Sequence, residues 1–192
     1  NGKKGYISNF FFGFSKCTGN IIFPCDQDDI WLPNKIQLMS ETMINHSEIN
    51  VLYCNPILWD CGGSKKRIKY EIFRRKFRGK NDSSLTLGNK KLKNKLDTHP
   101  GCVLCFKKSF LDDYLSLETD GIAHDLFLCS LSAFSNSLYY LDIPVIKWRQ
   151  KEISTSKPQE YTKKNKRELL FHIYVFLCNL LNSSSFKKFD VL

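Results

Sequence analysis

Residues 21–35 read IIFPCDQDDIWLPNK, and this stretch decides the fold. The apolar run at 21–23 predicts a short buried strand. Three carboxylates follow it within four positions, at Asp26, Asp28 and Asp29. Because open α/β folds bind ligands beyond the carboxyl ends of their strands, the pattern predicts a ligand site at the edge of a sheet.

The three acids need compensation, because like charges this close repel one another. Carboxylate oxygens favour a hard divalent cation such as Mg²⁺ or Mn²⁺. The alternative is an acidic turn that caps a helix beginning at Pro33. The residues alone leave both interpretations open.

Residues 26–36, DQDDIWLPNKI, resemble the metal-binding DxD segment of family 2 glycosyltransferases. The resemblance is greatest to the rhamnosyltransferase-like members that build bacterial surface polysaccharides. It implies an α/β, GT-A-like (Rossmann-like) mixed sheet flanked by helices. It also implies a divalent metal, Mg²⁺ or Mn²⁺, held by Asp26 and Asp28. Asp26 and Trp31 would contact the substrate.

Further motifs follow in the order that this family has them. His124-Asp125 resembles the His/Glu-Asp pair at the start of a helix, which implies that Asp125 is the catalytic base and that His124 lies at the substrate. Gly101-Cys102 resembles the family's Gly-Cys strand beneath the acceptor site. From the residues alone, Asp125 could instead satisfy only the amides of its own helix.

The segment Trp148-Arg149-Gln150 resembles the family's aromatic-Arg-Gln-His motif. Arg149 and Gln150 would then bind the donor, and the guanidinium of Arg149 could clamp its diphosphate. The simpler interpretation pairs Arg149 with a surface acid. Lys151 stands where the family usually has His, and a protonated lysine cannot ligate a metal.

The resemblance implies an enzyme that moves a sugar such as rhamnose from a nucleotide-sugar donor to a polysaccharide or lipid-linked acceptor, with inversion. Asp125 would take the proton from the attacking hydroxyl. Two alternatives remain open. One is a non-catalytic remnant of such an enzyme, and the other is a basic module that binds a membrane or nucleic acid.

The net charge of +10 is unevenly distributed. Residues 60–97 carry thirteen Lys and Arg against four acids, and residues 68–78 could form a basic amphipathic helix on a membrane or a solvated loop. We expect a cytoplasmic protein, in peripheral contact with the inner face of a bacterial plasma membrane through this segment. Nucleic acid is not an expected partner, because no nucleic-acid-binding motif is recognised.

The eight cysteines stand mostly in apolar runs without a secreted-framework pattern, which predicts reduced, cytosolic thiols. Cys102 and Cys105 have zinc-like spacing. Because no second Cys or His pair accompanies them, a strand core is favoured.

The apolar pattern predicts the following elements. Helices are expected at 8–16, 33–47, 108–117, 123–137 and 161–181, and strands at 21–23, 51–59 (broken at Pro56), 102–106 and 139–146, the last at an edge or irregular because of Pro144. The family resemblance implies that residues 1–156 are the C-terminal portion of a GT-A domain, with the basic insert 60–97 and without its N-terminal nucleotide-binding unit. Residues 157–192 would be a helical extension.

Overall fold

The computed structural model describes residues 5–60, 85–87, 100–112 and 123–150. The elements, in chain order, are α1 (Tyr6–Lys16), β1 (Ile21–Ile22), β2 (Ile30–Trp31), α2 (Lys35–Asn45), β3 (Val51–Asp60), β4 (Leu85–Leu87), the 3₁₀ turn η2 (Gly101–Val103), β5 (Leu104–Lys107), α4 (Lys108–Asp112), α5 (His124–Phe134) and β6 (Leu138–Gln150). The expected helices at 68–78 and 161–181 and the expected boundary at 156/157 lie outside the described residues.

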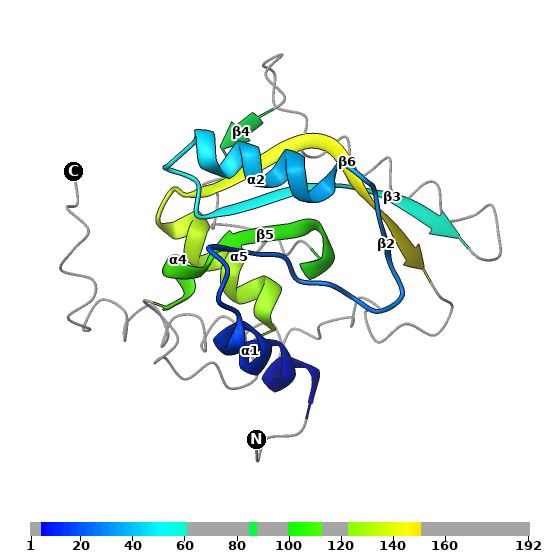
Figure 1. Ribbon diagram of the computed structural model, residues 1–192, viewed down its shortest axis with the longest axis horizontal. Helices are drawn as coiled ribbons and strands as arrows, with labels where there is room; N and C mark the ends of the chain where they lie inside the picture. The colour runs from blue at the N-terminus through cyan, green and yellow to red at the C-terminus, as the bar shows by residue number, and fades with distance from the viewer. Residues whose placement is uncertain (1–4, 61–84, 88–99, 113–122, 151–192) are drawn as a thin grey trace, which may run out of the picture.

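The described strands form one mixed sheet with the order β1-β5-β3-β6-β2 (Figure 1). Strand β6 pairs in parallel with β3 and antiparallel with β2, and β4 pairs with its first half. The other pairings, β1 with β5 and β5 with β3, are antiparallel. The predicted strand at 139–146 is therefore longer than expected and central, so the expected edge position is wrong.

Pro56 predicts a break in the strand at 51–59. In the structure the strand is continuous, and its pairing with β6 is irregular there instead. The register shifts on both sides of Asn55, which pairs with Pro144, and β3 continues to Asp60. The amide of Asn55 donates to the carboxylate of Asp142, which also accepts a 2.7 Å hydrogen bond from the hydroxyl of Tyr140. Side-chain hydrogen bonds thus accompany the bulge, and the alternative expectation for Pro144, an irregular position, is confirmed.

Helices α1 and α2 lie on opposite faces of β5. The Sγ of Cys105 lies 3.1 Å from the Sδ of Met43 on α2. The next residue, Phe106, faces Phe14 on α1 with a ring-centroid distance of 5.0 Å. Because successive side chains of a strand point to opposite faces, β5 is covered on both sides, and its first three residues are buried.

The apolar pattern of residues 33–47 predicts one buried side made of Ile36, Met39, Met43 and Ile44, and the structure confirms only the two methionines. Lys35, Met39 and Met43 are buried, whereas Ile36 is 45% exposed and Ile44 is 72% exposed. The helix also begins at Lys35, after Asn34, rather than at Pro33. The spacing of the three buried positions is helical, so the interior side of α2 begins with a charged residue.

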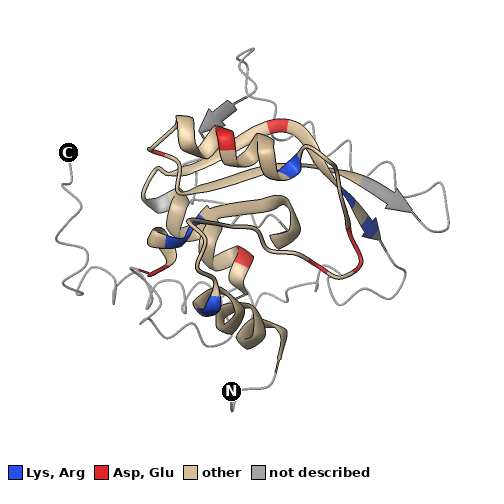
Figure 2. Ribbon diagram, viewed as in Figure 1, with Lys and Arg blue, Asp and Glu red and all other residues tan. Residues whose placement is uncertain are grey.

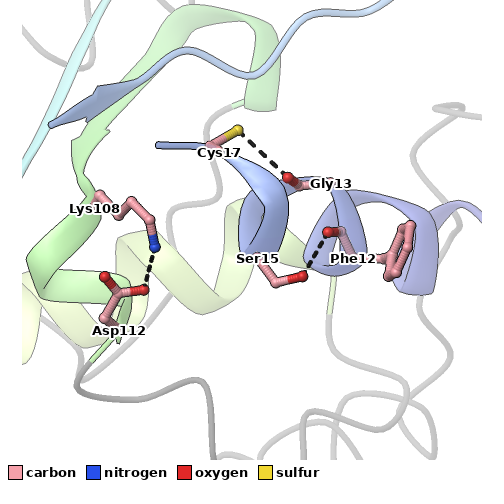
Figure 3. A network of polar contacts seen from close by, with 6 residues as sticks. All are labelled: Phe12, Gly13, Ser15, Cys17, Lys108 and Asp112. Carbon is pink, nitrogen blue, oxygen red and sulfur yellow. Dashed lines mark hydrogen bonds and ion pairs between the residues drawn. The ribbon is translucent and has the colours of Figure 1, made fainter. Parts of the chain in front are cut away.

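Helix α1 packs on α5, with the rings of Phe11 and Phe127 5.4 Å apart. Local polar contacts secure its last turn and the neighbouring α4 (Figure 3). The hydroxyl of Ser15 donates to Phe12 O at 2.7 Å, and Lys108 pairs with Asp112 at 2.6 Å. None of the described helices is long and apolar enough to span a lipid bilayer.

Candidate active site

Acidic residues gather along the loop between β1 and β2 (Figure 2). Within it, a carboxylate oxygen of Asp26, one of Asp29 and the Sγ of Cys102 all lie within 4.8 Å of one another. Cys102 comes from η2, far along the chain, and is 1% exposed. The fold therefore brings three candidate metal-ligating atoms together at one point. We call Asp26, Asp29 and Cys102 the acidic cluster.

Asp29 attaches this loop to the end of β6. Its Oδ1 accepts a hydrogen bond of 2.9 Å from the backbone N–H of Arg149. Its Oδ2 is buried, and the carboxylate also accepts a hydrogen bond from the thiol of Cys102. Asp29 thus joins the β1–β2 loop both to the end of β6 and to η2.

A buried lysine lies beside the acidic cluster. Lys35 has no exposed surface, its Nζ donates a 2.7 Å hydrogen bond to Cys102 O, and the same Nζ lies 4.1 Å from the ring centroid of Trp31. Burial lowers the pKa of Lys35. The positive charge of Lys35 in turn opposes the rise in the pKa of both Asp26 and Asp29. Lys35 is therefore a fixed countercharge for the acidic cluster.

The carboxyl groups of this region influence one another. Burial is the main cause of the raised pKa of Asp26, and the negative charges of Asp29, Asp28 and Asp125 add to it. The pKa of Asp29 is also raised, mainly by burial, with Asp28 contributing. Asp125, from the start of α5, is thus within electrostatic reach of the acidic loop.

Asp125 lies in the first turn of α5, where its Oδ1 accepts a 2.8 Å hydrogen bond from the N–H of Leu126. Burial raises the pKa of Asp125, and backbone hydrogen bonds oppose that rise. A raised pKa makes a carboxylate a stronger base. The position therefore suits proton abstraction.

His124 is packed rather than hydrogen-bonded. Its ring stacks on Phe10 with centroids 3.8 Å apart, and both ring nitrogens are buried without a hydrogen-bond partner among the described residues. Burial lowers the pKa of His124 to about 4, so the imidazole is neutral at physiological pH. A Cβ added at Gly101 would lie 2.3 Å from His124 Nε2, so only glycine fits there without displacing the ring.

The structure thus links most of the residues singled out by sequence. Asp26 and Cys102 belong to the acidic cluster, Asp125 acts electrostatically on Asp26, and Trp31 contacts Lys35. Gly101 and His124 touch beside Asp125, while Arg149 meets Asp29 through its backbone. Asp28 lies outside the cluster, although its charge acts on it. Gln150 ends β6, its side chain is not described, and Lys151 lies outside the described residues.

Two residues escaped the sequence interpretation. The sequence pattern indicates Asp29 only as one of three neighbouring acids, and it indicates no role for Lys35. Spacing could have revealed Lys35, because it stands four residues before Met39 on the stripe that continues to Met43. No comparable signal separates Asp29 from Asp28.

The six described cysteines are free thiols, Cys17, Cys25, Cys54, Cys102, Cys105 and Cys129. Cys102 and Cys105 do not converge on a common site, since one faces the acidic cluster and the other Met43. Burial raises the pKa of Cys54 to about 12. It also raises the pKa of Cys102, where the negative charge of Asp29 adds to the effect.

Comparison with known proteins shows a family match and similar solved structures. The family described as Glycosyl transferase family 2 matches residues 1–114. Crystal structures of S. aureus TarS 1–349 have similar folds. The complex with UDP is 12% identical with a TM-score of 0.57, covering 91% of this chain and 46% of that chain. The complex with UDP-GlcNAc is 12% identical with a TM-score of 0.55, and the match covers 90% of this chain and 46% of that chain. This chain thus spans less than half of the TarS chains. No curated protein matches it significantly.

These findings agree with the architecture described above. The mixed sheet with helices on both sides is that of the TarS structures, so the expected α/β, GT-A-like fold is confirmed. The family match covers more than half of the chain and includes both the acidic loop and η2. The chain therefore belongs to glycosyl transferase family 2.

Proposed function

We propose that this protein transfers a sugar from a nucleotide-sugar donor to a saccharide or lipid-linked saccharide acceptor, with inversion, in cell-surface polysaccharide synthesis. One observation carries the proposal: the fold brings Asp125 from the start of α5 close enough to the β1–β2 loop to act electrostatically on Asp26, which forms the acidic cluster with Asp29 and Cys102. The TarS structures support the donor class, since they hold UDP and UDP-GlcNAc. Rhamnose remains the transferred sugar that the sequence resemblance favours.

The residues of the acidic loop fit a divalent ion. Carboxylate oxygens are the ligands that Mg²⁺ and Mn²⁺ prefer, and one carboxylate oxygen of Asp26 and one of Asp29 lie within 4.8 Å of each other. We propose Asp26 and Asp29 as ligands, with Asp28 as the alternative that the DxD pattern offers. When bound, the ion would neutralise the charge that develops on the departing diphosphate.

The remaining steps belong to side chains of this chain. Asp125 takes the proton from an acceptor hydroxyl as the oxygen attacks the anomeric carbon, and a general base of this kind contributes about 10²–10⁴-fold in rate. Trp31, whose ring lies against the ammonium group of Lys35, would shape the pocket for the sugar. Arg149 is positioned by Asp29 at the same end of the sheet, where its guanidinium can contact the diphosphate.

Calorimetry on the full-length protein tests this function and the choice of ligands. We expect a nucleoside diphosphate to bind more tightly when Mn²⁺ is present. The Mn²⁺ effect should disappear in Asp26→Asn and Asp29→Asn and persist in Asp112→Asn, a control that alters an exposed carboxyl group. If the Mn²⁺ effect disappears in Asp28→Asn but not in Asp29→Asn, Asp28 rather than Asp29 is the metal ligand. Tight binding that is independent of Mn²⁺ in every variant would overturn the metal-dependent proposal.

A further inference from the structure

The acidic cluster contains a ligand atom that is unusual beside a magnesium-type site. Its third member is the thiol of Cys102, whose Sγ lies within 4.8 Å of carboxylate oxygens from both Asp26 and Asp29. The residue is 1% exposed, so the thiol cannot turn to solvent. The three atoms come from two segments that the fold has brought together, the β1–β2 loop and η2.

Each member of the cluster is held in place by a contact of its own segment. The carbonyl of Cys102 accepts the 2.7 Å hydrogen bond from Lys35 Nζ, and the preceding Gly101 packs directly against His124. Asp29 is fixed through Oδ1 by the backbone N–H of Arg149, and its carboxylate also accepts a hydrogen bond from the Cys102 thiol. The thiol therefore already contacts one of the two proposed carboxylate ligands in a preorganised site.

We propose that Cys102 is a third ligand of the divalent ion, and that this thiol makes the site prefer Zn²⁺ or Co²⁺ to Mg²⁺. The inference rests on the metal site of the proposed function. A sulfur donor selects softer ions, whereas a set of oxygen donors alone suits Mg²⁺. On binding, the S–H bond breaks, a bond forms between sulfur and the ion, and the proton passes to solvent. No electron is transferred and no oxidant is needed.

Titration of Co²⁺ into the full-length protein gives a direct spectroscopic test. A cobalt–thiolate bond produces a charge-transfer band in the near ultraviolet, which carboxylate ligation does not. We expect the band to saturate at one Co²⁺ per protein in the wild type and in Cys25→Ser, a control that removes the exposed thiol beside Asp26. Cys102→Ser should lose the band, and its affinity for Zn²⁺ should fall at least about tenfold, the lower end of what even outer-shell changes cost. Its affinity for Mg²⁺ should change little.

A measurement on the wild type alone covers the case in which Cys102→Ser does not fold. X-ray absorption at the zinc edge should show a sulfur neighbour at about 2.3 Å in addition to oxygen neighbours. One bound ion with oxygen neighbours only, or a band that survives in Cys102→Ser, would overturn the role of Cys102 and leave the proposed function intact. Failure of the wild type to bind Mn²⁺, Co²⁺ or Zn²⁺ would overturn both the role of Cys102 and the metal site of the proposed function.

Discussion

The Nζ of Lys35 donates a 2.7 Å hydrogen bond to the carbonyl oxygen of Cys102, and Lys35 has no exposed surface. The contact joins the first residue of α2 to the turn that precedes β5. An ammonium group is costly to bury, because its charge loses the hydration it has in water. Here it contacts the Trp31 ring and lies close enough to Asp26 and Asp29 to affect their ionisation.

Replacing Lys35 by Met should raise the pKa of Asp29 above its wild-type value. The variant keeps much of the volume but removes the positive charge that opposes the rise caused by burial. Carboxyl-detected NMR titration gives the value directly. Lys16→Met, which removes an exposed lysine at the end of α1, is the matched control and should leave Asp29 unchanged. Equal values in both variants would show that Lys35 does not act on the acidic cluster.

Gly101→Ala should lower the free energy of unfolding by about 1–3 kcal/mol, the usual cost of overpacking a buried site. The added Cβ would lie 2.3 Å from His124 Nε2, so the ring must move. Urea denaturation measures the loss. In Gly19→Ala the nearest atom is Ile21 O at 3.8 Å, an ordinary contact, and stability should be nearly unchanged. If the clash is the cause, adding His124→Ala to Gly101→Ala should recover part of the loss; purely additive effects would speak against it.

Acidification should weaken the fold through His124. Its pKa is about 4 in the folded chain against 6.5 for an unperturbed histidine, so between these values the unfolded chain holds a proton that the folded chain refuses. Stability from this residue is complete above pH 6.5 and is lost as the pH falls toward 4. The full effect is about 3 kcal/mol, at roughly 1.4 kcal/mol per pKa unit. Denaturant midpoints measured across this range provide the check.

In His124→Asn the loss of folding stability on acidification should be smaller, because asparagine does not titrate. The raised pKa values of Asp26, Asp29 and Asp125 act in the opposite sense. These groups take up protons in the folded chain first, so acidification through their raised pKa values adds stability. If the dependence of folding stability on pH is the same in His124→Asn as in the wild type, His124 is not its source.

Asp125→Asn should lower turnover by about 10²–10⁴-fold while donor binding survives. Asparagine keeps the shape of the side chain and can still accept the hydrogen bond from Leu126 N–H, but it cannot accept a proton from the acceptor. Steady-state rates and donor affinity, measured on the same preparation, separate the two effects. Asp112→Asn is the control for an exposed carboxyl group. Turnover within about threefold of wild type would remove Asp125 from the role of base.

The local elements were largely predictable from sequence. The phenylalanine-rich helix appears as α1, the strand before the acids as β1, and the helix that follows Ala123 as α5, with ends that differ by a few residues. These segments are indicated by short-range patterns of apolar residues, and such patterns do not depend on the tertiary contacts of the segment.

Features that depend on distant partners were not predictable. The hydrophobic pattern assigned Ile36 and Ile44 to the buried side of α2, yet Lys35 took that position because a carbonyl and an indole ring from other segments were there to receive it. Asp29 rather than Asp28 joins Asp26 for the same reason, since its second partner is the backbone of Arg149. Similarly, β3 continues beyond Pro56 because its pairing with β6 shifts register beside Asn55.

The order of strands in the sheet has a consequence for how the chain folds. No two described strands that follow one another in sequence are neighbours, so no hairpin starts the sheet. Instead, Ile21 meets Lys107, Val51 meets Leu138 and Ile30 meets Lys147. Long loops must close before any of these pairings is rewarded, which makes such topologies slow to fold. During synthesis, β1 and β3 remain unpaired until β5 at residues 104–107 has been made, and β2 remains unpaired until β6 at residues 138–150 follows, so the acidic cluster is assembled late in folding.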